Sequence, residues 1–192
     1  MQQYSLVYLH DYIVSNEIGE EEIKSILSDF SCPKNQDIEK FLKEKALAFE
    51  KIGLARTILV FKECDDTAKF VGYFSIAIKQ IDISEISKED RRKIFKTRYS
   101  LGNEIPTILI GQLAKNFTND NNLLITGYDL LYLAFDYIKE MSKNTPSFVV
   151  SIDCENNEKI KYFYESVGFK FLKYSDNDLL CYIIPTKEIL KK

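Results

Sequence analysis

Thr126, Gly127 and Asp129 begin a helical pattern directly after a polar loop, an arrangement that could bind an anion. Thr126 and Asp129 stand three residues apart, as the two side chains of a capping box do. Gly127 adds no side chain to the first turn, and the N–H groups at a helix N-terminus attract phosphate. The charge of Asp129 opposes such binding, and many helices that bind nothing begin in this way. These residues alone therefore leave two interpretations open, a phosphate site and an ordinary helix start.

Tyr164 is the second residue that could do chemistry. It lies among apolar residues at helical spacing, and Gly168 ends that pattern. A tyrosine hydroxyl can act as a general acid when it lies over a reacting centre. The same ring could instead be a core aromatic, with Gly168 as a helix C-cap. The local sequence is compatible with both roles.

Other common catalytic groups are scarce. His10 is the only histidine, which excludes most mechanisms that pair serine or cysteine with histidine. The four cysteines are scattered, whereas a zinc site needs about four ligands in close register. We therefore expect no metal cofactor, and we interpret the cysteines as buried, reduced thiols: Cys32, Cys64, Cys154 and Cys181.

The composition is that of a globular protein, and we expect a single domain over 1–192. The chain is 45% hydrophobic and 29% charged, which excludes a disordered segment or a disulfide scaffold. Its net charge of −3 argues against a dedicated nucleic-acid binder, so nucleic acid is not an expected partner. Six lysines and arginines within 87–98 could face RNA, but a solvated helix face explains them better. No apolar run suits a membrane span and no leader is visible, so we expect a cytoplasmic protein.

Hydrophobic periodicity and the order of the elements predict a single mixed α/β layer structure. We predict strands over 4–12, 56–62, 70–79, 105–115, 147–152, 169–174 and 179–184. We predict helices after a cap at Ser15 and Asn16, over 37–51, within 87–98, from Gly127 towards Pro146, and before Gly168. The strand over 105–115 is apolar enough to be buried on both faces. Polar turns over 63–67 and 175–178 would join two hairpins.

A fixed spacing links the last helix to a known family. Asn157 is followed after seven residues by Tyr164, after four more by Gly168, and then by Phe169. Together with the strand, loop, helix and strand before it, this pattern resembles the GNAT superfamily of acyl-CoA-dependent N-acetyltransferases. The resemblance covers about 36–184 and implies a central mixed sheet flanked by helices.

A narrower resemblance covers 30–61. This segment places Gly53, Ala55 and Thr57 before a strand, after a helix that contains Phe-Leu. It is similar to the N-terminal region of GNAT members of bacterial toxin–antitoxin pairs, which acetylate aminoacyl-tRNA.

The resemblance implies an acetyl-CoA site. The strand backbone at Leu113, Ala114 and Lys115 would pair with the pantetheine amides, and Asn157 would contact or orient the pantetheine arm. Tyr164 would protonate the departing thiolate of CoA. Backbone N–H groups would cradle the pyrophosphate along the loop that opens the helix, at Asn122, Ile125, Thr126, Gly127 and Tyr128.

This loop departs from the family pattern, Arg/Gln-x-x-Gly-x-Gly/Ala. Asn122 takes the basic or amide position, Ile125 replaces the first glycine, and only Gly127 remains. A β-branched residue resists positive φ and would crowd the phosphates. Either the loop takes a different path, with Thr126 supplying a hydroxyl, or cofactor binding is weak or lost.

Our leading expectation is an enzyme that transfers acetyl from acetyl-CoA to a primary amine. The expected acceptor is a small molecule or a peptide, and a homodimer is possible. Water, Asp153 or Glu155 would accept the proton of the amine. Two alternatives remain: a toxin-like acetyltransferase of aminoacyl-tRNA, and a non-enzymatic GNAT-fold binding module with a degenerate cofactor loop.

Overall fold

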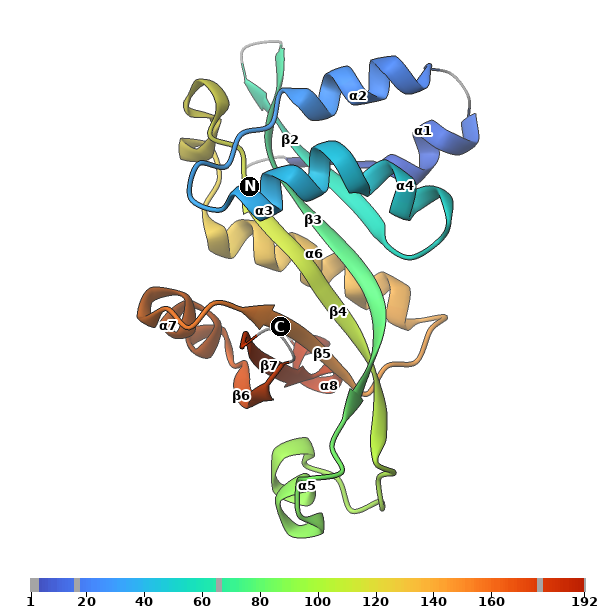
Figure 1. The fold of residues 1–192 in the computed structure, drawn as a ribbon, viewed down its shortest axis with the longest axis vertical. Helices are drawn as coiled ribbons and strands as arrows, with labels where there is room; N and C mark the ends of the chain where they lie inside the picture. Colours follow the sequence, from blue (N-terminus) through green and yellow to red (C-terminus); the bar gives the residue numbers. More distant parts are fainter. Residues whose placement is uncertain (1–3, 16–17, 65–66, 176–177, 192) are drawn as a thin grey trace. The chain divides into compact units, whose positions relative to one another are not determined.

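The structure, a computed structural model, describes residues 4–15, 18–64, 67–175 and 178–191. Its seven strands follow the order β1-β2-β3-β4-β5-β7-β6 (Figure 1). β4 and β5 pair in parallel, whereas β1 with β2, β2 with β3, and β7 with both β5 and β6 pair antiparallel. The expected mixed sheet flanked by helices is confirmed.

The elements have the following bounds. The strands are β1 Tyr4–Tyr8, β2 Arg56–Cys64, β3 Thr67–Asp82, β4 Glu104–Lys115, β5 Val149–Cys154, β6 Lys170–Tyr174 and β7 Leu180–Pro185. The α-helices are α1 Leu9–Ser15, α2 Glu20–Ser28, α3 Gln36–Lys40, α4 Ala46–Lys51, α5 Lys88–Phe95, α6 Gly127–Ser142, α7 Glu158–Val167 and α8 Thr186–Ile189. A π-helical turn, η1 Phe41–Lys45, joins α3 to α4, and a 3-10 turn, η2 Thr118–Leu123, precedes α6.

The chain forms two compact units. Unit 1 comprises Met1–Ala77 and Gly111–Asp136, and unit 2 comprises Ile78–Ile110 and Tyr137–Lys192. β3, β4 and α6 each run from one unit into the other. Pairing of β4 with β5 covers Thr107 to Leu109, within unit 2.

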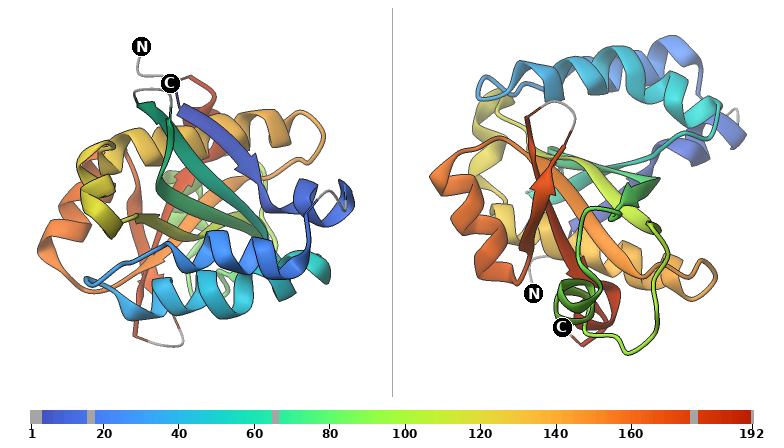
Figure 2. Two further views of the ribbon diagram at one scale, coloured as in Figure 1. Left: turned by 90° about the horizontal axis from the view of Figure 1, so that it is seen from above. Right: turned by 60° about the horizontal axis from the view of Figure 1, so that its bottom comes forward.

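Unit 1 is built on β1, β2 and the first part of β3. α2, α3 and α4 cover one face of these strands, and the first part of α6 lies on the other (Figure 2). The Phe30 ring lies at the centre of the first layer, 5.0 Å from the Tyr73 ring and 5.8 Å from the Phe70 ring. Buried side chains around it include Leu9, Ile23, Leu27, Leu42, Leu59 and Ala114.

Unit 2 contains β5, β7 and β6, with α5, α7 and α8. Its core joins Phe95 of α5 to side chains from four strands, namely Ile81, Ile105, Val149, Cys181 and Ile183. Burying these apolar side chains ties the charged helix α5 to the sheet.

Two predicted elements differ from the structure. The strand expected over 4–12 ends at Tyr8, because Leu9 and Tyr12 recur at helical spacing and both pack into the unit 1 core, so α1 begins at Leu9. The expected cap at Ser15 and Asn16 is wrong for α2, whose N-cap is Gly19. Asn16 lies outside the described residues, as do parts of the two predicted turns, 65–66 and 176–177.

Candidate functional site

The end of β4 lies close to β3 in unit 1. A Cβ atom on Gly72 of β3 would lie 2.7 Å from the carbonyl oxygen of Ala114 and 3.3 Å from the Cα of Lys115. Real Cβ atoms essentially never come that close to backbone, so only glycine lets the two strands approach in this way. The backbone at Leu113, Ala114 and Lys115, predicted to pair with pantetheine, is thereby set by a residue more than 40 positions away.

The loop between β4 and α6 makes its turn without a glycine. Its left-handed residues are Asn119 (φ 50°) and Asp120 (φ 59°), and Ile125 is not among the described residues with positive φ. Asparagine and aspartate adopt this conformation more readily than β-branched residues do. Ile125 is only 2% exposed, so its side chain points into the protein, which argues against the expected crowding of the phosphates.

The capping box predicted at the start of α6 is confirmed. The N–H and the hydroxyl of Thr126 donate to Asp129 Oδ2 at 3.0 and 2.7 Å, and the N–H of Asp129 donates to Thr126 Oγ1 at 3.1 Å. The Thr126 hydroxyl proton is thus already used, which argues against its donation to a phosphate. Gly127 opens the helix without a side chain, and the N–H of a first helical residue has no intrahelical partner.

Two lysines place positive charge on this loop. Lys115 Nζ donates to the carbonyl of Asn122 at 2.8 Å, and Lys62 Nζ donates to the carbonyl of Leu124 at 3.1 Å. Burial, and then the charge of nearby Lys34, lowers the pKa of Lys115, so three ammonium groups share this region. Sequence reasoning missed Lys62 as a loop residue, because no local pattern connects it to a segment 62 residues away.

Helix α7 of unit 2 carries the motif residues as predicted from their spacing. The Asn157 side chain caps the helix by accepting the N–H of Lys159 at 2.9 Å. Gly168 is the C-cap with φ 103°, a left-handed conformation that favours glycine, and its N–H donates to the carbonyl of Glu165 at 2.9 Å. Asn157 and Gly168 thus define both ends of the helix that carries Tyr164.

Tyr164 is buried, with 8% of its surface exposed. Its ring meets the rings of Phe163 and Phe169 edge to face, at 4.9 and 5.6 Å. Burial, and then the neighbouring Cys154, raises its pKa above the usual value. Burial keeps the proton on the Tyr164 hydroxyl at neutral pH, so the group holds a proton that it can donate, while the raised pKa makes it a weaker acid than a free phenol.

Of the two predicted proton acceptors, Asp153 is already engaged. Its Oδ2 accepts from Lys79 Nζ at 2.5 Å, and its Oδ1 is buried without a hydrogen-bond partner. Glu155, directly after β5, is exposed. Proton transfer to Asp153 would therefore have to use Oδ1.

The remaining polar candidates serve structural roles or form no cluster. His10 Nδ1 lies 3.7 Å from Glu50 Oε1, and its side chain is 45% exposed. All four cysteines are free thiols, three of them buried and Cys64 partly exposed. In the described part of the chain, no group of three or more His, Cys, Asp or Glu residues could hold a metal ion. Within those residues there is also no helix long and apolar enough to cross a membrane.

The basic residues within 87–98, around α5, include one buried side chain and several exposed ones. Arg91 is buried and donates to backbone carbonyls of Ile86 at 2.7 Å, Gly102 at 2.9 Å and Ser84 at 3.1 Å. Interpreting Arg91 as part of a solvated face is therefore wrong, because its guanidinium holds the surrounding loops together. The other basic side chains of the stretch are exposed: Lys88, Arg92, Lys93, Lys96 and Arg98.

No protein-family model matches the sequence. Several solved structures match nearly the whole chain. A structure described as a bacterial toxin has a TM-score of 0.71 at 16% identity, covering 100% of this chain and 95% of its own. A mutant of KacT has a TM-score of 0.68 at 19% identity, covering 99% of both chains. AtaT complexed with acetyl-methionyl-tRNAfMet has a TM-score of 0.67 at 20% identity, covering 98% of both.

These neighbours overturn the expectation about partners. AtaT has been solved with acetyl-methionyl-tRNAfMet and with the C-terminus of the antitoxin AtaR, and KacTA has been solved with DNA. A small-molecule or peptide acceptor with no nucleic-acid partner is therefore the wrong expectation. It rested on a net charge of −3, which averages over the whole surface and hides local basic regions such as α5. The chain therefore shares the fold of AtaT and KacT over nearly its whole length.

Proposed function

We propose that the protein transfers an acetyl group from acetyl-CoA to the amino group of an aminoacyl-tRNA, and that an antitoxin protein binds and restrains it. The observation that carries this proposal is the likeness over 98% of both chains to AtaT in complex with acetyl-methionyl-tRNAfMet. The spacing of Asn157, Tyr164, Gly168 and Phe169 independently supports acetyl transfer, the first part of this proposal.

The residues around the start of α6 fit an acetyl-CoA pyrophosphate. Gly127 has no side chain to block an approach to the helix N-terminus, whose dipole favours an anion. The ammonium groups of Lys62 and Lys115 on the adjoining loop offset the charge of Asp129. The backbone from Leu113 to Lys115 would hold the pantetheine arm. Acetyl-CoA supplies the acetyl group as an activated thioester.

Tyr164 is the proposed proton donor, and therefore the catalytic residue. Its hydroxyl stays protonated over the physiological range, so a proton is available for the departing thiolate. The rings of Phe163 and Phe169 hold its side chain in one orientation. The aromatic packing that made Tyr164 resemble a core residue is thus compatible with catalysis.

The exposed side chains of α5 are the proposed surface for the tRNA backbone. Lys88 and Arg92 are exposed, and Lys93 is paired with Glu89 at 2.8 Å. Arg91 fixes the helix from inside, so the exposed cations belong to an ordered element. Electrostatic contact with phosphates predicts that tRNA affinity falls steeply as salt is added.

The test is acetyl transfer from radiolabelled acetyl-CoA to purified tRNAs, each either charged with its amino acid or deacylated. We expect label in at least one charged tRNA and none in its deacylated form. Arg92→Glu should weaken tRNA binding, whereas the same change in charge at Lys24, an exposed position on α2 of unit 1, should not. Acetyl-CoA binding without transfer to any charged tRNA would contradict the proposed acceptor.

A further inference from the structure

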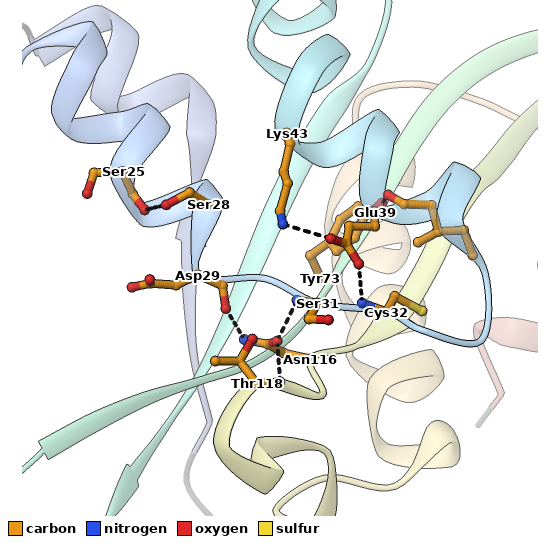
Figure 3. Close-up of polar contacts among 11 residues, drawn as sticks. Ser25, Ser28, Asp29, Ser31, Cys32, Glu39, Lys43, Tyr73, Asn116 and Thr118 are labelled. Carbon is orange, nitrogen blue, oxygen red and sulfur yellow. Dashed lines mark hydrogen bonds and ion pairs between the residues drawn. The ribbon is translucent and has the colours of Figure 1, made fainter.

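The loop between β4 and α6 lacks the family's first glycine, yet it is held in one shape by contacts from distant segments. Asn116, directly after β4, is fully buried. Its side-chain oxygen accepts the N–H groups of Ser31 and Thr118, both at 3.0 Å (Figure 3). Its amide nitrogen donates to the carbonyls of Asp29 at 3.1 Å and Phe70 at 2.9 Å. A carboxamide offers two donors and two lone pairs, so its hydrogen-bonding capacity is used completely.

A second asparagine meets the first at the same acceptor. Asn121 Nδ2 donates to the carbonyl of Phe70 at 3.2 Å, and the carbonyl of Asn121 accepts the N–H of Leu124 at 3.1 Å. Asn116, two residues before η2, and Asn121, within η2, thus donate to the same carbonyl of β3. We name this arrangement, formed by Asn116, Asn121 and the carbonyl of Phe70, the asparagine clamp.

The segment between the two asparagines is strained. Asn119 and Asp120 are consecutive left-handed residues, with φ of 50° and 59°. Such conformations cost free energy and persist when surrounding contacts over-determine them. The asparagine clamp supplies these contacts, and the next residues, Asn122 and Leu124, are those whose carbonyls receive the two lysines.

From this geometry we infer that Asn116 and Asn121 are positioning residues for the pyrophosphate loop. They replace the glycine-rich sequence by fixing the chain reversal at Asn119 and Asp120, which leaves Ile125 free to pack inward. This inference rests on the proposed acetyl-CoA site, but the asparagine clamp itself can be tested without the cofactor.

The first measurement is amide hydrogen exchange over 117–125 in Asn121→Ala. Asn121 is partly exposed and makes one side-chain hydrogen bond to the clamp, so this variant should fold even if Asn116→Ala does not. We expect exchange in this segment to accelerate by about tenfold or more as the loop opens locally. The control is Tyr73→Phe on the same strand as Phe70, which keeps the ring and removes a hydrogen bond of 2.7 Å to the carbonyl of Ile38, a residue outside the clamp. It should leave exchange over 117–125 unchanged.

The second experiment measures acetyl-CoA affinity by calorimetry and the turnover number by steady-state kinetics. Asn121→Ala and Asn116→Ala should each weaken binding by about fivefold or more, the equivalent of one net hydrogen bond. The turnover number at saturating acetyl-CoA should stay within about twofold, because neither residue takes part in proton transfer. Since both act through one loop, the double variant should lose less than the product of the two effects.

The outcomes separate the two proposals. Unchanged exchange over 117–125 in Asn121→Ala would overturn the asparagine clamp, whatever the affinity. Faster exchange with unchanged acetyl-CoA affinity would overturn its role in positioning the pyrophosphate loop. Failure of the wild-type protein to bind acetyl-CoA would refute the proposed function, while the exchange experiment would still decide whether the clamp holds the loop.

Discussion

The loop before α6, in unit 1, and the helix α7, in unit 2, each carry residues predicted to serve acetyl-CoA, and the two segments are stabilised in opposite ways. In α7, Asn157 and Gly168 act within a few residues of their own positions, as caps. In the loop, Asn116 and Lys62 act across the chain, on segments that lie 46 residues or more away in sequence. A local motif is visible in a single sequence, whereas a long-range contact is not. The missing glycine at Ile125 is therefore weaker evidence against a cofactor site than the sequence alone indicated.

For α7, the variant with the largest expected effect is Tyr164→Phe, which tests whether Tyr164 is the proton donor. This change removes only the hydroxyl and keeps the ring that packs on Phe163 and Phe169. A positioned general acid contributes a factor of about 10²–10⁴ in rate. Turnover should therefore fall by at least about tenfold, and by as much as about 10⁴-fold. Melting temperature and acetyl-CoA affinity should barely change. Kinetics on a charged tRNA, together with a thermal melt, provide the measurement.

The matched control is Tyr162→Phe on the same helix. Tyr162 is 71% exposed, and loss of its hydroxyl should leave the rate unaffected. A raised pKa also means that Tyr164 keeps its proton as the pH rises towards its ordinary value of 10.0. The wild-type rate should therefore not decline between pH 7 and 9 through ionisation of this group. A Tyr164→Phe protein as active as the wild type would reduce Tyr164 to a packing role.

Gly127→Glu tests whether the loop before α6 and the first turn of α6 bind the pyrophosphate. The new side chain puts bulk and negative charge at the first turn of α6, where the pyrophosphate is proposed to bind. Acetyl-CoA at a hundredfold excess over its dissociation constant stabilises a folded protein by about 2.7 kcal/mol. We expect thermal-shift measurements to find that stabilisation in the wild type and to find it lost in the variant.

Gly19→Glu is the control for Gly127→Glu. Gly19 is the N-cap of α2, and a Cβ atom there would meet nothing within 4 Å. This variant places the same charge at another helix start of unit 1, and it should keep the full acetyl-CoA shift. Equal loss in both variants would mean that charge or stability, rather than the start of α6, controls the response.

The sequence was sufficient to predict the α/β layer structure, the capping box at Thr126 and Asp129, and Gly168 as the C-cap of α7, because each depends on periodicity or on neighbours a few residues apart. It failed where tertiary contacts decide the outcome. The run over 4–12 satisfies strand propensity, but burial of Leu9 turns its second half into α1.

Charge patterns were the least informative part of the sequence. Arg91 stands in a run of basic residues and looks like its neighbours, yet backbone carbonyls of two loops surround it. Ile125 likewise occupies a glycine position in the motif, but its side chain is buried. The charge of Arg91 suggests a surface side chain, and the motif position of Ile125 suggests an exposed loop. Only the three-dimensional structure shows that both side chains are buried. Net charge failed for the same reason, since it contains no information on where charges lie.

Changes at Asn157 should have the smallest effects on stability and acetyl-CoA affinity. They are informative because Asn157 caps α7 and is also proposed to contact the cofactor. Asn157→Ala removes the cap of α7 and should cost about 1 kcal/mol in the free energy of unfolding. Asn157→Asp keeps an oxygen that can accept the N–H of Lys159, so stability should be retained, but it removes the amide N–H donors. If Asn157 also contacts pantetheine through these donors, Asn157→Asp should weaken acetyl-CoA binding without lowering the melting temperature. Full affinity in Asn157→Asp would leave Asn157 a helix cap alone, and the cofactor contacts would then come from the backbone of β4 and the start of α6.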